Sequence, residues 1–241
     1  MSGEGERLQK VLARAGLGSR RAVEELIRQG RVRVNGERAI LGRRVDSSHD
    51  EVEVDGSRVP LRGDLQHLLL NKPVGVITTS SDPEGRPSVL EYVGTPERVW
   101  PVGRLDIDSS GALLLTNDGP LTHRLTHPSF GVPKTYVAEA TGRISARALR
   151  RLSSGVPLED GLTAPAQVRL LDRTTAVSLV EITVGEGRNR QVRRMLETVG
   201  HPVRSLVRTA IGPLQLGRLA EGTVRNLRPD EVRALYRVTG L

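Results

Sequence analysis

The sequence predicts an α+β protein in which a small N-terminal domain of two helices and a small sheet precedes a larger domain, whose mixed, mainly antiparallel sheet is flanked by helices. Two helical patterns and several short strands occupy the first 60 residues. Beyond them, strand-like runs are joined by connections of unequal length, with few strand–helix–strand repeats. No Gly-x-Gly-x-x-Gly follows a strand, which argues against a doubly wound nucleotide-binding fold.

The composition is typical of a globular protein that can bury a core, with 37% hydrophobic and 27% charged residues in a chain of 241. Residues Met1–Glu6 are polar and do not resemble a signal peptide, and no apolar run approaches the roughly 20 residues that span a bilayer. We therefore expect a cytoplasmic protein with no membrane partner. The chain has no cysteine and its five histidines lack HExxH-type spacing, so we expect neither a metal nor another cofactor.

The elements of the N-terminal domain follow from spacing and turn residues. Apolar residues at helical spacing predict a helix that ends before Gly16-Leu17-Gly18, and Ser19 is placed to cap a second helix that runs to Gly30. Arg31–Val34 alternates as a half-buried strand. Asn35-Gly36 is a strong hairpin signal, so a small sheet should follow the helix pair.

Basic residues concentrate in this domain. The chain carries a formal net charge of +8, and between Glu6 and Arg44 eleven Arg and Lys residues accompany only four acids. From Asp46 to Asp64 the balance reverses to six acids and two arginines. A solvated helix face is one interpretation, but clustering over two adjacent helices favours phosphate binding to a polyanion. The candidate phosphate-binding residues are Arg7, Lys10, Arg14, Arg20, Arg21, Arg28, Arg31 and Arg33.

The larger domain begins after a short polar stretch that contains a proline and a glycine. This stretch predicts a linker at residues 61–66 between domains at 1–60 and 67–241. Strand-like runs predict strands at 67–71, 74–79, 112–116, 135–141, 167–171 and 176–184. Helical patterns predict helices at 145–152, 190–199 and 229–236.

One loop of this domain presents a carboxylate at the edge of a rigid element. The segment Gly103-Arg104-Leu105-Asp106-Ile107-Asp108-Ser109-Ser110-Gly111 leads directly into the apolar run Ala112–Leu115. In an extended chain Arg104, Asp106 and Asp108 would share one face, with Leu105 and Ile107 anchoring the other. Physical reasoning alone leaves a nucleophile, a general base, a metal ligand and a turn-capping carboxylate open for Asp106.

Three further segments carry candidate site residues. Tyr136 is one of few aromatic residues and lies in Lys134-Thr135-Tyr136-Val137-Ala138, where a core tyrosine is the alternative. A glycine-containing loop, Gly185–Asn189, runs into a helix rich in arginine, which could also be a basic solvent face. Lys72-Pro73-Val74-Gly75 reads as a rigid turn, with Lys72 as a possible phosphate contact.

These strings together resemble a known family. Gly103–Gly119 is similar to the catalytic motif of the RsuA/RluB family of ribosomal RNA pseudouridine synthases. The segment from Glu6 to about Asp55 resembles the S4 RNA-binding domain, most clearly over residues 6–36. The resemblance implies that Asp106 is the essential catalytic residue, that Tyr136 packs on a flipped uracil and that Arg193 pairs with the catalytic carboxylate. It implies a substrate pocket that includes Arg104 and Leu206, and RNA contacts from Lys72, Lys134, Arg188, Arg190 and Arg194.

The resemblance also implies the partner and the reaction. A uridine of ribosomal RNA, or of a precursor ribosomal subunit, would be isomerised without a cofactor by a monomer, and the segment Leu158–Ala166 favours 23S over 16S RNA. Two other functions remain open. The chain could be a non-catalytic RNA-binding assembly factor, or a glycoside hydrolase using Asp106 and Asp108. With only 2% aromatic residues, a sugar-binding cleft is the poorer fit.

Overall fold

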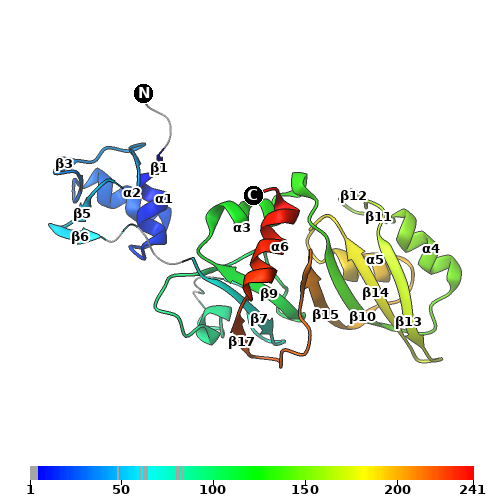
Figure 1. The fold of residues 1–241 in the computed structure, drawn as a ribbon. Coiled ribbons are helices and arrows are strands. Elements are labelled where there is room, and N and C mark those ends of the chain that lie inside the picture. Colours follow the sequence, from blue (N-terminus) through cyan, green and yellow to red (C-terminus); the bar gives the residue numbers. More distant parts are fainter. Residues whose placement is uncertain (1–4, 48, 60, 62–64, 80–81, 83) are drawn as a thin grey trace. The chain divides into compact units, whose positions relative to one another are not determined.

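The computed structural model describes residues 5–47, 49–59, 61, 65–79, 82 and 84–241 (Figure 1). Contacts between Cα atoms divide the chain into two compact units, Met1–Gln66 with Thr95–Val99, and His67–Gly94 with Trp100–Leu241. Half of the predicted linker at 61–66, residues 62–64, lies outside the described residues. The sequence did not predict that Thr95–Val99 belongs to the first unit, where Arg98 donates to the carbonyl oxygens of Ala13 and Gly18.

The first unit begins with the predicted pair of helices. Strand β1 (Glu6–Arg7) leads into helix α1 (Leu8–Arg14), and helix α2 (Arg20–Arg28) follows. The Ser19 hydroxyl accepts a hydrogen bond from the amide of Ala22 at 3.1 Å, which confirms the predicted cap.

A four-stranded antiparallel sheet completes this unit, in the order β3-β2-β5-β6, and β1 pairs with β4. The strands are β2 (Val32–Val34), β3 (Glu37–Arg38), β4 (Arg44–Val45), β5 (Val52–Val54) and β6 (Ser57–Val59). Both residues of the predicted Asn35-Gly36 turn have positive φ, 51° and 80°, as a tight hairpin requires. Apolar residues of both helices and of the sheet share one core, among them Leu8, Leu12, Val23, Val32 and Val52.

The second unit is built on a nine-stranded sheet, which confirms the predicted mixed, mainly antiparallel arrangement. The strand order is β13-β14-β10-β15-β9-β7-β17, with β16 on β15 and β8 on β9, and only β9 and β15 run parallel among the described pairs. The strands are β7 (His67–Lys72), β8 (Trp100–Pro101), β9 (Ser110–Thr116), β10 (Lys134–Thr141), β13 (Gln167–Arg173), β14 (Val177–Val184), β15 (Val203–Ile211), β16 (Leu214–Gln215) and β17 (Val224–Asn226).

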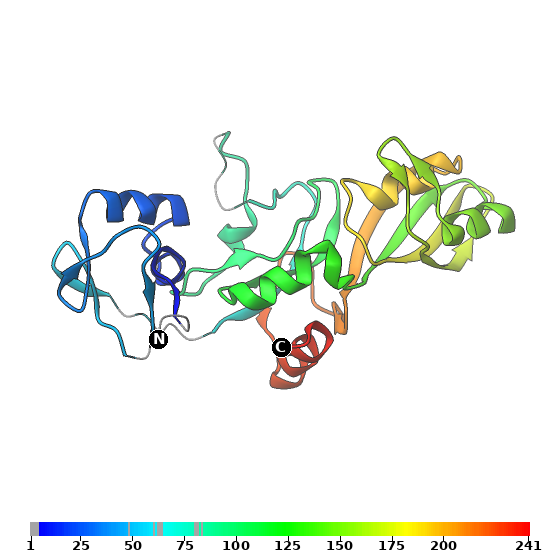
Figure 2. The same cartoon turned by 90° about the horizontal axis from the view of Figure 1, so that it is seen from above.

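Two groups of helices cover the two halves of this sheet (Figures 1 and 2). Helices α4 (Ala146–Ser154) and α5 (Gln191–Thr198) share a core with β10 and β14, beside the short hairpin of β11 (Pro157–Leu158) and β12 (Gly161–Leu162). Helices α3 (Gly119–Thr126) and α6 (Pro229–Thr239) share a second core with β7 and β9. Two short 3-10 helices, η1 (Val89–Tyr92) and η2 (Pro128–Phe130), lie in connections. The two cores meet where β15 runs between β9 and β10.

The predicted strand at 74–79 is wrong. Val74 and Gly75 form a turn, and only Ile77 makes an isolated bridge, with Ser88. Pro73 and Gly75, which has φ of 87°, turn the chain away from the sheet. The amide of Gly75 instead donates to the carbonyl oxygen of Ile107 at 2.7 Å, so this segment supports the loop that carries Asp106.

Candidate active site

The loop between β8 and β9 is held by backbone and hydroxyl contacts on both sides of Asp106. The Thr78 hydroxyl bonds with both the carbonyl oxygen and the amide of Leu105, at 2.9 and 3.3 Å. The amide of Ser109 donates to the carbonyl oxygen of Asp106 at 3.1 Å and closes a turn. The predicted extended geometry is therefore wrong at this point: the turn leaves Ile107 45% exposed, while Leu105 is buried as expected.

The two carboxylates of this loop have different surroundings. Asp108 accepts two hydrogen bonds from the guanidinium of Arg190, at 3.0 and 2.7 Å, and these bonds hold the pKa of Asp108 below its usual value. Asp106 lies 3.8 Å from the same guanidinium, with a third of its side chain exposed. Asp108 thus anchors Arg190, and Asp106 keeps oxygens available to a ligand.

The arginine beside Asp106 differs from the one expected. Arg193 was expected to pair with the catalytic carboxylate, but it donates to the Asp108 carbonyl oxygen at 2.6 Å and to the Ser109 hydroxyl at 3.3 Å. Its Nε lies 3.4 Å from the Asp108 carboxylate. Arg193 therefore supports the loop from behind, whereas Arg190 reaches Asp106 because it precedes α5 in a left-handed conformation with φ of 46° and ψ of 31°. Such a conformation is costly for a residue with a side chain and is frequent at functional sites.

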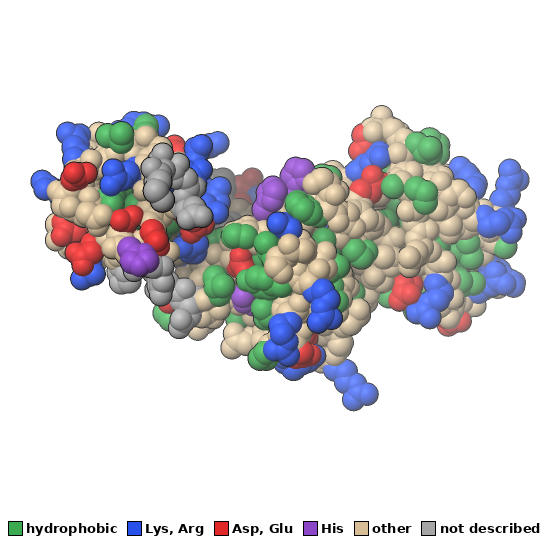
Figure 3. Space-filling view, turned by 45° about the horizontal axis from the view of Figure 1, so that its top comes forward, with side chains coloured by type: hydrophobic (Ala, Val, Ile, Leu, Met, Phe, Trp, Pro, Cys, Tyr) green, Lys and Arg blue, Asp and Glu red, His purple; other side chains and the backbone are tan. Residues whose placement is uncertain are grey.

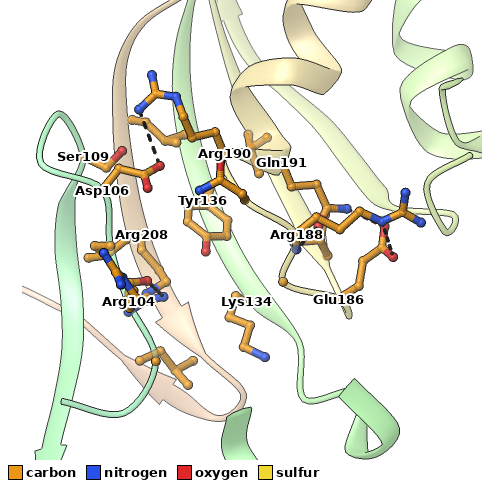
Figure 4. A pocket seen from close by; sticks show the side chains of 18 of the residues that line it. Arg104, Asp106, Ser109, Lys134, Tyr136, Glu186, Arg188, Arg190, Gln191 and Arg208 are labelled. Carbon is orange, nitrogen blue, oxygen red and sulfur yellow. Dashed lines mark hydrogen bonds and ion pairs between the residues drawn. The ribbon is translucent and has the colours of Figure 1, made fainter. Parts of the chain in front are cut away.

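An open cavity of about 520 Å³ lies in front of Asp106, as Figure 4 shows. Its walls come from the Asp106 loop, from β10 and β15 and from the segment 186–192. The structure brings together the following predicted residues at this cavity: Arg104, Asp106, Lys134, Tyr136, Arg188, Arg190 and Leu206. Arg193, Lys72 and Arg194 are not among the residues that line it.

Two adjacent strands supply the side wall. Tyr136 on β10 lies opposite Arg208 on β15, and Leu206 lies opposite Ala138. Cross-strand partners point to the same face of a sheet, so Tyr136, Leu206 and Arg208 all face the cavity. The partly buried ring of Tyr136 packs on the core shared with α5, which leaves a firm aromatic surface for a planar ligand.

The other arginines of the α5 segment hold a neighbouring hairpin. Arg188 donates to the carbonyl oxygens of Asp160, Gly161 and Leu162 at 3.3, 3.0 and 2.7 Å. Arg194 binds the Asp160 carboxylate with two bonds of 2.9 and 3.0 Å. The segment Leu158–Ala166, to which the sequence assigned no chemical role, thus joins the cavity loop through these arginines.

Lys72 is not placed to contact RNA, contrary to one of the two predictions made for it. The residue has no exposed surface, and its ammonium donates to the carbonyl oxygen of Pro73 at 2.8 Å. Burial lowers the pKa of Lys72 to about 8, although the nearby charges of Asp106 and Asp108 act in the opposite direction. Lys72 is therefore an internal cation behind the Asp106 loop.

Arg208 is the functional candidate that the sequence analysis missed. Only 4% of its surface is exposed, and its Nε donates to the carbonyl oxygen of Ala112 at 2.7 Å. A second nitrogen donates to the carbonyl oxygen of Arg104 at 3.2 Å. The side chain thereby joins the two ends of the Asp106 loop. Alternation along a strand would have found it, since Arg208 follows the predicted pocket residue Leu206 by two positions.

The cations predicted on the first unit fall into two groups. Four of them pair with acids of the same unit: Lys10 and Arg14 with Glu6, Arg28 with Glu25, and Arg31 with Asp55. The other four have no acidic partner within the described part of the chain, so no carboxylate competes with a phosphate for them: Arg7, Arg20, Arg21 and Arg33. Figure 3 shows Lys and Arg side chains interspersed with acidic ones on this unit.

The described residues contain no group of three or more His, Cys, Asp or Glu side chains that could hold a metal ion. None of their helices is both long and apolar enough to cross a membrane.

Comparisons with known proteins agree with this geometry. Residues 66–198 match the RNA pseudouridylate synthase family and residues 6–52 match the S4 domain. Ribosomal large subunit pseudouridine synthase B of Bacillus subtilis is 47% identical over 95% of this chain and 95% of the relative, and its namesake in Haemophilus influenzae is 41% identical over 99% and 69%. A crystal structure of a pseudouridylate synthase, 31% identical, covers 95% of this chain and 99% of its own with a TM-score of 0.69. The chain therefore belongs to the RNA pseudouridine synthases that carry an S4 domain at the N-terminus.

Proposed function

We propose that this enzyme isomerises a uridine of large-subunit ribosomal RNA to pseudouridine, with Asp106 as the catalytic carboxylate. The observation that carries the proposal is the cavity in which the Asp106 carboxylate, the Tyr136 ring and the Leu206 side chain converge. The large-subunit preference rests on the names and the 41–47% identity of the relatives from Haemophilus influenzae and Bacillus subtilis. We further infer that the enzyme acts as a monomer in the cytoplasm.

The reaction conserves atoms. The bond from N1 of uracil to C1′ breaks, the base turns, and a bond from C5 to C1′ forms while the C5 proton is lost and N1 gains one. No redox step and no energy source is needed for this balance. Asp106 either attacks the sugar or removes a proton on a route through a glycal. Arg190, 3.8 Å from the carboxylate, places a positive charge beside it in either route.

The target base has to leave its stack to reach Asp106. Base flipping costs on the order of a few kcal/mol, and stacking on an aromatic ring returns about 1–3 kcal/mol per base. Tyr136 offers such a ring at the side of the cavity. We assign the cations without acidic partners on the S4 unit, Arg7, Arg20, Arg21 and Arg33, to the RNA backbone, because phosphate contacts position a protein without reading sequence.

The substrate is tested by incubating the purified full chain with 23S and 16S transcripts and with precursor subunits. Pseudouridine is then mapped by chemical modification and reverse-transcription stops. A new stop in 23S RNA that is absent with Asp106→Asn and present with Asp230→Asn, an exposed carboxylate of α6, supports the proposal. A stop confined to 16S RNA contradicts the large-subunit assignment, and RNA binding with no stop in any substrate favours a non-catalytic assembly factor.

A further inference from the structure

The charges that line the cavity do not balance. It contains two acidic residues, Asp106 and Glu186, and each already lies beside an arginine. Asp106 is 3.8 Å from Arg190, and Glu186 is 3.1 Å from Arg188. Glu186 also accepts from the side chain of Gln191 at 2.6 Å. Each of the two carboxylates therefore already has an arginine beside it.

Three other cations of the cavity have no acidic partner among the described residues: Arg104, Lys134 and Arg208. Burial lowers the pKa of Lys134, and the charge of Arg208 lowers it further. The two cations therefore repel one another in a partly desolvated place. Like charges held together without a counter-charge are unfavourable, and an anionic ligand removes that cost.

Arg208 provides a second, independent sign of a missing ligand. Its Nε and one terminal nitrogen bind carbonyl oxygens, but the other terminal nitrogen is buried and has no hydrogen-bond partner. A buried N–H group without an acceptor is uncommon in folded proteins and costly. Since Arg208 lines the cavity, an acceptor supplied from the cavity would satisfy this donor.

The sheet register places these cations beside the aromatic wall. Lys134 precedes Tyr136 by two residues on β10, and Arg208 lies directly opposite Tyr136 on β15. In the view of Figure 4, Tyr136 stands between Asp106 and Lys134. A base stacked on Tyr136 would therefore carry its ribose and phosphates past Lys134 and Arg208. Uracil itself is neutral, whereas each nucleotide of RNA brings one negative phosphate.

We propose that Lys134 and Arg208 form a phosphate subsite that binds a phosphate group attached to the nucleotide whose base stacks on Tyr136. This inference rests on the proposed function for the nature of the ligand. The subsite fixes the register of the target nucleotide in the cavity, and Arg208 links it to the Asp106 loop through its bonds to Arg104 and Ala112. A phosphodiester oxygen is a strong acceptor for a guanidinium and for an ammonium.

The test compares binding of uridine, uridine 5′-monophosphate and uridine 3′-monophosphate to the full chain by NMR titration. The wild type should bind one of the monophosphates roughly ten- to hundredfold more tightly than uridine, as expected for charge-assisted hydrogen bonds. Lys134→Met and Arg208→Met should bring this ratio close to one and leave the uridine affinity largely unchanged. Arg204→Met is the matched control, because Arg204 lies on β15 like Arg208 but is exposed and pairs with Glu139.

Thermal unfolding of each variant shows whether the fold persists. Arg208→Met loses two hydrogen bonds and can fail this check, whereas no side-chain hydrogen bond of Lys134 is found in the described structure, so Lys134→Met carries the test. Equal or undetectable binding of nucleotides and uridine by the wild type overturns the subsite, as does an equal loss of both in Lys134→Met. Phosphate preference without pseudouridine formation would refute the proposed function alone, and pseudouridine formation without phosphate preference would refute the subsite alone.

Discussion

Replacement of Lys72 by methionine tests whether the buried charge of this residue lowers the folding stability of the enzyme. Lys72 has no exposed surface, and burial lowers the pKa of its ammonium from 10.5 to about 8. Each pKa unit corresponds to 1.36 kcal/mol, so a shift of this size costs about 3 kcal/mol of folding free energy at neutral pH. Lys72→Met removes this cost but leaves the Pro73 carbonyl oxygen without its donor, a loss of about 1–2 kcal/mol. The variant should therefore be about 1–2 kcal/mol more stable at pH 7.

The pH dependence of the unfolding free energy provides an independent check that the charge of Lys72 is destabilising. Between pH 8 and 10.5 the unfolded chain still binds the Lys72 proton and the folded protein has released it. The wild type should therefore gain stability as the pH rises through this window. The advantage of Lys72→Met should shrink by about 2 kcal/mol between pH 7 and pH 10.

Urea unfolding at both pH values measures these differences. Activity should fall at the same time, because the variant lacks a positive charge near Asp106 and Asp108. A variant that is several kcal/mol less stable than the wild type at pH 7, with no change in the difference at pH 10, would refute this reasoning. It would mean that the neighbouring carboxylates compensate the buried charge fully.

Three further substitutions have defined outcomes. Gly111→Ala should destabilise the fold by more than about 3 kcal/mol in urea unfolding. The reason is that φ at Gly111 is 108° and the new Cβ would lie 2.3 Å from a backbone oxygen of β15. The control Gly94→Ala, with open space around it, should change stability by less than about 1 kcal/mol. Arg190→Gln removes both bonds to Asp108 and should lower kcat on the order of a hundredfold with little change in Tm; an unchanged kcat would exclude a role for this arginine. Tyr136→Phe keeps the aromatic surface, so KM should be retained, and a fall in kcat would assign proton transfer to the hydroxyl; a large rise in KM would contradict the stacking role.

Local sequence signals predicted the elements whose geometry is decided by neighbouring residues. The Ser19 cap, the Asn35-Gly36 hairpin and the buried strand β9 all depend on a few adjacent side chains and are confirmed. Helix α3 was missed although Asp118 caps it by accepting from the amide of Leu121 at 3.0 Å, because its eight residues lack a clear apolar repeat. The strand predicted at 74–79 failed because a proline–glycine turn outweighed its apolar pattern.

The site was predictable in its residues more than in its pairings. The resemblance pointed to Asp106, Tyr136 and Leu206, which the fold brings to one cavity. Arg190 lies beside Asp106 in place of the expected Arg193. This depends on the left-handed conformation of Arg190 before α5 and on the turn in the Asp106 loop, and neither can be predicted from residue types. The burial of Lys72 was not predicted, because burial of a charged residue depends on strands that are distant in sequence. Arg208 was missed although it follows Leu206 by two positions on one strand.

The most direct test of the central claim separates the two neighbouring carboxylates of the loop. Single-turnover pseudouridine formation on 23S RNA should be compared for the wild type, Asp106→Asn and Asp108→Asn, with RNA affinity and thermal unfolding as controls. The account predicts that Asp106→Asn binds RNA normally and forms no pseudouridine, whereas Asp108→Asn, which loosens Arg190 and Arg193, retains slow activity. Persistent pseudouridine formation by Asp106→Asn, or complete loss only in Asp108→Asn, would contradict the assignment of Asp106 as the catalytic carboxylate.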